Sequence, residues 1–143
     1  GAIPEQTSPV ISVVTDEFDK YVFDDAKDVL LELYAPWCGH CKRLAPTYEK
    51  LAELYAADAQ ASKQVRIAKM DGTENDLPPH ADIQLTGFPT IVLKPAGKHA
   101  REFIVYDGDR TLESLSDFVA TQGKNKAKIS VPAPEQPVKH DEL

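Results

Sequence analysis

The hydrophobic and polar positions along the chain predict an alternation of strands and helices. Residues 28–35 form a nearly continuous apolar run, which is typical of a strand buried on both faces. Residues 10–14 and 65–70 are shorter apolar runs that contain β-branched side chains and predict two more strands. Between the first two of these strands, Thr15 is expected to cap a helix that ends at about Phe23.

Two further helices are indicated by apolar side chains spaced three or four residues apart. The first is expected to run from just after Cys38 to about Ala57, with Pro46 kinking it. Its apolar stripe consists of Leu44, Tyr48, Leu51 and Tyr55. The closing helix ends before Gly123, a suitable C′ residue. Its apolar face consists of Leu112, Leu115, Phe118 and Val119.

The segment between these helices predicts an antiparallel strand pair. Residues 90–93 and 102–106 have strand character, and residues 94–97 contain the Pro and Gly of a connection. A short helical turn is expected around Asp76 and should end at Pro79. The order β-α-β-α-β-(α)-β-β-α predicts an α/β fold with a central mixed β-sheet flanked by helices.

The length of 143 residues suits one domain, which we place at residues 8–123. Residues 124–143 are polar and contain several prolines, so we expect a flexible tail. This tail ends in His140-Asp141-Glu142-Leu143, which is a retention signal of the endoplasmic reticulum lumen. The chain begins with Gly1 and shows no secretory signal segment. We therefore expect the C-terminal part of a longer precursor, retained in that lumen by a receptor and joined to other domains of the same parent chain.

Composition narrows the function classes. Hydrophobic residues make up 42% and charged residues 27% of the chain, which are ordinary globular proportions. The net charge of −7 argues against nucleic-acid binding, because an acidic surface repels phosphates. The sequence lacks a run of 18 apolar residues, so no membrane insertion is expected.

The candidate chemistry lies in Cys38 and Cys41, the two cysteines of the chain. A structural disulfide would close so short a loop that it would stabilise the fold by only about 2 kcal/mol. A structural zinc ion needs four ligands, and no second Cys-x-x-Cys is present. A haem attachment needs His directly after the second cysteine, where Lys42 stands. A redox dithiol at the start of a helix fits the context, and it requires no cofactor.

The position of the pair assigns its roles. Unpaired N–H groups and the dipole at a helix N-terminus stabilise a thiolate, so Cys38 is expected to be an exposed nucleophile. Cys41 lies one turn into the helix and should be more buried and protonated. Gly39 and His40 separate the two, and a protonated His40 would lower the Cys38 pKa further. A Gly-Pro pair at these positions would instead have suggested a general reductase.

The nine residues Tyr34-Ala35-Pro36-Trp37-Cys38-Gly39-His40-Cys41-Lys42 resemble the active site of the protein disulfide isomerases, which have the thioredoxin fold. Together with the C-terminal signal they resemble the last catalytic domain, a′, of a classical fungal member. The resemblance implies that the Phe88–Pro89 bond is cis and lies beside the cysteines. It also implies that Glu32 is a buried carboxylate with Lys69 as its partner, and that Arg110 is a mobile side chain that approaches Cys41.

Glu32 also stands out from the residues alone, because it interrupts the apolar run at 28–35. Leu31 and Leu33 flank it, so an alternating strand with Glu32 facing solvent stays possible. We favour burial, which would raise its pKa and let it exchange a proton with Cys41. The aromatic residues near the cysteines are expected to form a shallow apolar patch for unfolded peptide, made of Trp37, Phe88 and Pro89.

The resemblance implies a thiol–disulfide oxidoreductase and isomerase that forms, reduces and rearranges disulfide bonds in proteins folding in the endoplasmic reticulum. Its expected partners are unfolded or misoxidised proteins and, for recharging the pair, a luminal thiol oxidase or glutathione. The alternative is a peptide-binding chaperone module in which the redox activity is secondary. Serine variants of Cys38 and Cys41 distinguish the two.

Overall fold

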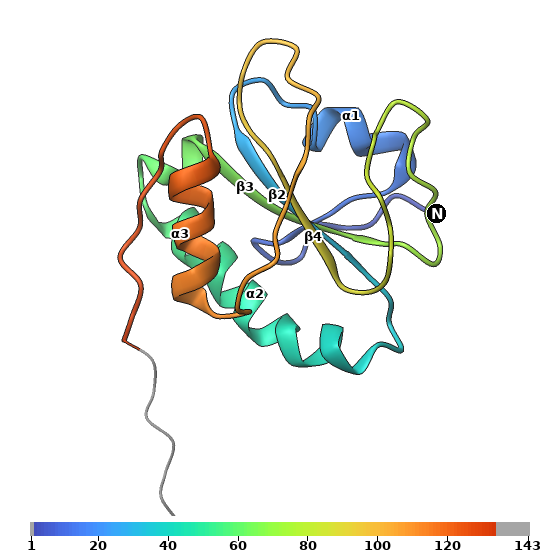
Figure 1. Cartoon of the computed structure of the whole chain (residues 1–143), viewed down its shortest axis with the longest axis horizontal. Coiled ribbons are helices and arrows are strands. Elements are labelled where there is room, and N and C mark those ends of the chain that lie inside the picture. Colours follow the sequence, from blue (N-terminus) through green and yellow to red (C-terminus); the bar gives the residue numbers. More distant parts are fainter. Residues whose placement is uncertain (1, 134–143) are drawn as a thin grey trace, which may run out of the picture.

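A computed structural model describes residues 2–133 of the chain (Figure 1). The strands are β1 (Ile11–Ser12), β2 (Asp28–Tyr34), β3 (Val65–Asp71), β4 (Thr90–Lys94) and β5 (Ile104–Val105). The helices are α1 (Phe18–Tyr21), α2 (Gly39–Ala57) and α3 (Leu112–Gln122), with single 3₁₀ turns at Thr15–Glu17 and Ala61–Lys63. Among the described residues, no helix has the length and hydropathy needed to cross a membrane.

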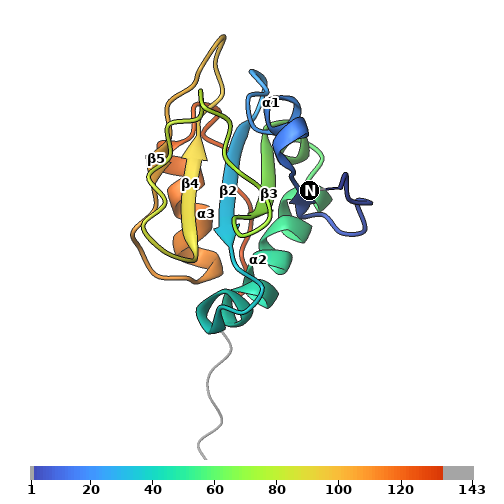
Figure 2. The ribbon, with the colours of Figure 1, turned by 90° about the vertical axis from the view of Figure 1, so that its right-hand side faces the viewer.

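The described strands form one mixed sheet in the order β1-β3-β2-β4-β5. Strands β1 and β2 run parallel to β3, whereas β4 pairs antiparallel with both β2 and β5. Figure 2 shows β5, β4, β2 and β3 side by side in this order. The predicted α/β class and mixed sheet are therefore confirmed. The central position of β2 explains its apolar composition, because neighbouring strands and helices enclose it.

Helices cover both faces of the sheet and divide the core in two. On one face, Leu30 of β2 packs in a cluster with Leu44 and Leu51 of α2 and Leu115 of α3. On the other face, Leu31 and Leu33 of β2 pack around Phe18 of α1. Even-numbered side chains of β2 therefore point toward α2 and α3, which places Glu32 under the start of the long helix.

Several local predictions differ from the structure at the N-terminal side of the sheet. The helix predicted from Thr15 is a 3₁₀ turn followed by the four residues of α1, and Thr15 does not cap it. Its hydroxyl instead donates a hydrogen bond of 2.6 Å to the backbone oxygen of Asp76. The helical turn predicted around Asp76 lies slightly earlier, as a single turn at residues 72–74 in which the Asn75 N–H donates to the Asp71 carbonyl at 3.1 Å. The bond from Thr15 therefore holds the chain directly after this turn.

The C-terminal boundary also differs from the prediction. Residues 124–129 were expected to leave the folded unit, but Ala127 is buried in the core and Ile129 packs against it. Asp28 holds the start of this segment, because its carboxylate accepts hydrogen bonds from the backbone N–H groups of Lys124, at 2.8 Å, and Asn125, at 3.0 Å. The retention signal at residues 140–143 lies outside the described residues.

Gly123 ends α3 for a different reason than predicted. Its φ of −71° and ψ of 151° are open to any residue, so no left-handed conformation requires a glycine. A Cβ atom at this position would instead lie 2.4 Å from Oδ2 of Asp28. Lack of space beside the buried carboxylate therefore selects glycine.

Replacing Asp28 by asparagine tests the hydrogen bonds that its carboxylate accepts from the backbone. Asp28 Oδ1 also accepts from the backbone N–H of Ala96 at 2.7 Å, so its two oxygens satisfy three backbone donors. The amide nitrogen of asparagine would face a donor, and we expect a loss of about 1–3 kcal/mol in the free energy of unfolding, measured in urea. Asp82→Asn, at an exposed position, is the control and should change it by less than about 0.5 kcal/mol. Equal effects of the two substitutions would show that these hydrogen bonds do not stabilise the fold.

Candidate active site

Cys38 is the N-cap residue of α2. Strand β2 ends at Tyr34, the backbone N–H of Cys38 donates to the carbonyl of Ala35 at 3.1 Å, and α2 begins at Gly39. The Cys38 sulfur accepts a hydrogen bond of 3.3 Å from the backbone N–H of Cys41. The side chain of an N-cap residue usually accepts this hydrogen bond through an oxygen atom. Here the acceptor is the Cys38 sulfur, so the helix N-terminus acts directly on the reactive atom.

The two cysteines are free thiols with opposite pKa shifts. The thiol of Cys41 donates to the Cys38 sulfur and lowers the Cys38 pKa, and the backbone N–H groups of Cys41 and His40 and the charge of Arg110 act in the same direction. Burial raises the pKa of Cys41 to about 11, and its hydrogen bond to Cys38 adds to this. The pair therefore consists of one activated and one protonated thiol, as their positions in the sequence predict.

Two details of the pair differ from the sequence prediction. Cys38 was expected to be exposed, but only 7% of its surface is accessible, against 5% for Cys41. Phe88 packs against the cysteines and covers part of the Cys38 surface. His40 was expected to add positive charge, and its Nδ1 contacts the Arg43 guanidinium at 3.0 Å. His40 acts on Cys38 through its backbone N–H instead.

Glu32 lies buried beneath the pair, with 4% of its surface exposed. Burial raises its pKa from 4.5 to about 7, and the charges of Lys69 and Arg110 limit the rise. The charge of Glu32 in turn raises the pKa of Cys41, so the two groups are within electrostatic reach of each other. A carboxyl group that titrates near neutrality beside a protonated thiol is suited to proton exchange with it.

Lys69 and Arg110 approach Glu32 from different elements. Lys69 is the register partner of Glu32 on β3, but no ion pair within 4.0 Å joins them in the described structure. Arg110 is exposed and precedes α3, and its charge lowers the pKa of both Glu32 and Cys38. The structure therefore brings together the cysteines, the carboxylate and both cations that the resemblance singled out.

An apolar surface borders the cysteines. The Trp37 side chain is 71% exposed and packs edge to face against Phe88, with ring centroids 6.0 Å apart. The Phe88–Pro89 bond is cis, as predicted, and the Phe88 carbonyl accepts a contact of 3.5 Å from the Cys38 thiol. Leu85 is 40% exposed, and its side chain lies near the Phe88 ring, because both are within 4 Å of the position that a Cβ atom on Gly72 would take. Sequence reasoning missed Leu85, although an apolar residue within a polar loop was the available signal.

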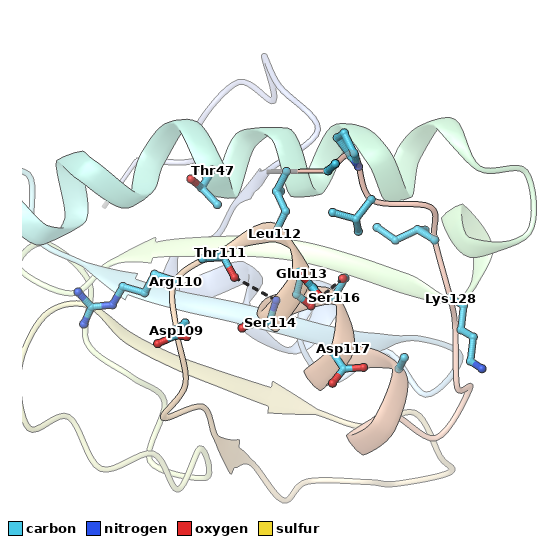
Figure 3. A pocket seen from close by; sticks show the side chains of 15 residues that line it. Thr47, Asp109, Arg110, Thr111, Leu112, Glu113, Ser114, Ser116, Asp117 and Lys128 are labelled. Atoms are coloured by element: carbon cyan, nitrogen blue, oxygen red, sulfur yellow. Dashed lines mark hydrogen bonds between the residues drawn. The ribbon is translucent and has the colours of Figure 1, made fainter. Parts of the chain in front are cut away.

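A pocket of about 1090 Å³ lies beside this site, between α3 and residues 128–133, and contains neither cysteine (Figure 3). Arg110 lies at its end, and its side chain points away from the other lining residues in Figure 3. Within residues 2–133, no three His, Cys, Asp or Glu side chains gather into a possible metal site.

Comparison with known proteins places this geometry in a family. The family model described as Thioredoxin matches residues 9–121. This chain belongs to the thioredoxin family. The match covers all the described strands and nearly all of α3, so the predicted thioredoxin fold is confirmed.

Relatives of this thioredoxin-family chain carry disulfide isomerase names. It is 51% identical over 134 residues to the protein disulfide-isomerase of Humicola insolens, covering 93% of this chain and 25% of the relative. It is also 51% identical over 118 residues to that of Saccharomyces cerevisiae, covering 82% of this chain and 21% of the relative. The chain thus spans about a quarter of the length of these relatives. The resemblance to fungal protein disulfide isomerases is confirmed.

A solved structure supports the same placement. The solution structure of the first thioredoxin domain of mouse protein disulfide-isomerase A4 matches with a TM-score of 0.66 and 29% identity. The match covers 97% of this chain and 91% of that one. This thioredoxin-family chain therefore has the extent of one such domain, and its cysteine pair stands at the start of α2.

The raised pKa of Glu32 predicts a pH-dependent stability. The unfolded chain releases this proton near the ordinary carboxyl pKa of 4.5, whereas the folded chain holds it to about 7. The folded state binds more protons between these values, so stability falls by about 3 kcal/mol as pH rises through them. Glu32→Gln should remove this slope and be more stable than the parent at pH 8.

Urea unfolding at pH 5 and pH 8 measures this effect. Glu102→Gln, at an exposed glutamate, serves as the control and should keep the slope of the parent chain. If the parent and Glu32→Gln lost equal stability between the two pH values, Glu32 would not carry the buried proton.

Proposed function

We propose that this chain is a thiol–disulfide oxidoreductase and isomerase that forms, reduces and rearranges disulfide bonds in protein substrates. One observation carries the proposal: the Cys38 sulfur caps α2, and the Cys41 N–H, 3.3 Å away, donates to it. This arrangement stabilises a thiolate at Cys38 and keeps a second thiol within reach of it. The identity of about 50% to fungal protein disulfide-isomerases supports the same activity.

In oxidation, a substrate thiolate attacks the sulfur of Cys38 in the Cys38–Cys41 disulfide. The bond between the cysteines breaks, a mixed disulfide forms, and Cys41 leaves as a thiolate that takes up a proton. A second substrate thiolate then attacks the substrate sulfur of the mixed disulfide and releases Cys38. The substrate loses two electrons and the cysteine pair gains them.

In reduction and isomerisation, the Cys38 thiolate attacks a substrate disulfide and releases one substrate thiolate. That thiolate can attack elsewhere in the substrate and free Cys38, which rearranges the disulfides without net electron transfer. Alternatively, Cys41 attacks Cys38 and releases a reduced substrate. Cys41 must lose its proton before it can attack Cys38 and release the substrate. Glu32 is the group placed to accept this proton.

Lys69 and Arg110 tune this proton exchange. Their charges favour the ionised form of Glu32, and Arg110 also stabilises the Cys38 thiolate. Arg110 is exposed, and a side chain with this freedom can move closer to the cysteines during the reaction. We assign both as residues that act through Glu32 and the cysteines.

The substrate surface consists of Trp37, Leu85, Phe88 and Pro89. Its exposed apolar groups suit unfolded or misoxidised chains, which expose apolar side chains that folded proteins bury. The electrons pass between sulfurs, so the exchange itself needs no cofactor. A luminal thiol oxidase or glutathione would restore the required form of the pair.

The cellular setting follows from the C-terminal sequence and the relatives. His140-Asp141-Glu142-Leu143 is a signal for retention in the lumen of the endoplasmic reticulum by a receptor. At the end of the chain, it also supports assignment to the last catalytic domain, a′, of a longer isomerase. The catalytic domain would extend from residue 8 to about residue 129, because Ala127 and Ile129 pack with its core, and the residues that follow would connect it to the signal.

Serine variants of the two cysteines test the proposed chemistry. Cys38→Ser should abolish refolding of a protein with scrambled disulfides, because no nucleophile remains at the N-cap. Cys41→Ser should accumulate the mixed disulfide, which non-reducing electrophoresis detects. If the variant lacking both thiols supported refolding as fast as the parent, the chain would act as a peptide-binding chaperone module instead.

Truncation of Trp37 tests the substrate surface. Trp37→Ala should raise KM for a reduced, unfolded protein several-fold and leave the reaction with glutathione nearly unchanged, because glutathione is too small to cover the patch. Val105→Ala removes part of another exposed apolar side chain, 60% accessible, from β5 and serves as the control. Equal effects of Trp37→Ala on both substrates would place the protein-binding surface elsewhere.

A further inference from the structure

Glu32, Tyr34 and Lys69 lie together on one face of the sheet. Glu32 and Tyr34 are two residues apart on β2, so their side chains point to the same side. Lys69 is the register partner of Glu32 on the parallel strand β3. A lysine and a glutamate in register on neighbouring strands are placed to form an ion pair.

The ion pair is not closed. Lys69 Nζ lies 5.6 Å from the centroid of the Tyr34 ring, which gives the ammonium a cation–π contact. Glu32 is buried, with only 4% of its surface exposed. Nevertheless, its carboxylate has no ion pair within 4.0 Å in the described part of the chain. The ammonium therefore lies over the aromatic ring instead of against the buried carboxylate.

Tyr34 makes one contact through its backbone and another through its side chain. Its backbone oxygen accepts a hydrogen bond of 2.9 Å from the N–H of Gly72, which fixes the end of β2 against the chain after β3. Its side chain packs against the cluster formed by Ala35, Cys38 and Cys41. The Tyr34 ring thus lies between the cysteine pair and Lys69.

We propose that Tyr34 is a positioning residue whose ring holds the Lys69 ammonium and so prevents a direct ion pair with Glu32. The inference rests on the proposed function, because it matters for catalysis only if Glu32 exchanges a proton with Cys41. Asp71 and Glu74 carry charges that act on Tyr34, and they add to the attraction of the ammonium toward this ring.

The placement of Lys69 decides how Glu32 titrates. The groups that act on Glu32 or feel its charge are Lys69 from β3, Arg110 before α3, Cys41 and Tyr48 from α2, and Tyr34 on β2 itself. With Lys69 at its present distance, burial dominates and the pKa of Glu32 is about 7. Such a group gives a proton during oxidation and takes one during reduction. A closed ion pair would leave it ionised and able only to accept.

Titration of the Glu32 carboxyl carbon by NMR in the reduced chain tests the proposal. Tyr34→Leu removes the ring face, so Lys69 should close on Glu32 and lower the midpoint of Glu32 by about one pH unit. At pH 7 its protonated fraction would then fall from about one half to about one tenth. Tyr34→Phe keeps the ring and should leave the midpoint unchanged. Lys69→Met removes the cation and should raise the midpoint.

A double substitution separates this role from a general disturbance of the fold. In a Lys69→Met background, Tyr34→Leu should no longer lower the midpoint, because no ammonium remains to be released. An unchanged midpoint in Tyr34→Leu alone, or an equal decrease in both backgrounds, would overturn the proposal. The titration requires no enzymatic activity, so its outcome is independent of the refolding assay that tests the proposed function.

Discussion

The site depends on one interaction, in which the first turn of α2 donates to the sulfur of its own N-cap residue. Every helix begins with N–H groups that lack partners within the helix, and here Cys38 accepts the one at Cys41. The buried strand β2 sets this position, because it ends directly before the turn that leads into α2. The reactive sulfur is therefore placed by the buried central strand, and the Cys41 thiol together with the backbone N–H groups of Cys41 and His40 lowers its pKa.

Glu32 shows a conflict between stability and chemistry within the same strand. A carboxyl group at the centre of the sheet costs about 3 kcal/mol when it ionises, and an apolar side chain there would avoid this cost. The leucines and valine of β2 are apolar and enclosed, which offsets the loss: Val29, Leu30, Leu31 and Leu33. Under the proposed function, the buried carboxyl in return gives Cys41 a proton acceptor that is shielded from bulk water.

Sequence patterns revealed features that arise from local periodicity or from a distinctive motif. The apolar run at residues 28–35 predicted β2, and the cysteine spacing predicted the dithiol at a helix start. Other features depend on contacts between distant segments. The location of Lys69 over Tyr34 follows from strand register, the glycine at 123 from the carboxylate of Asp28, and the covering of Cys38 from Phe88, fifty residues away. No local pattern encodes such distances.

The small accessible fraction of Cys38 has a consequence for selectivity. Disulfide exchange requires three sulfur atoms nearly in line, and a nucleophile that is 7% accessible admits such a line only along a narrow direction. A cysteine on a rigid, folded surface has few orientations in which its sulfur can meet that direction. A cysteine on a loosely folded chain can reach that direction, because the chain around it can bend. Under the proposed function, a sulfur with so little accessible surface would favour flexible partners over rigid ones.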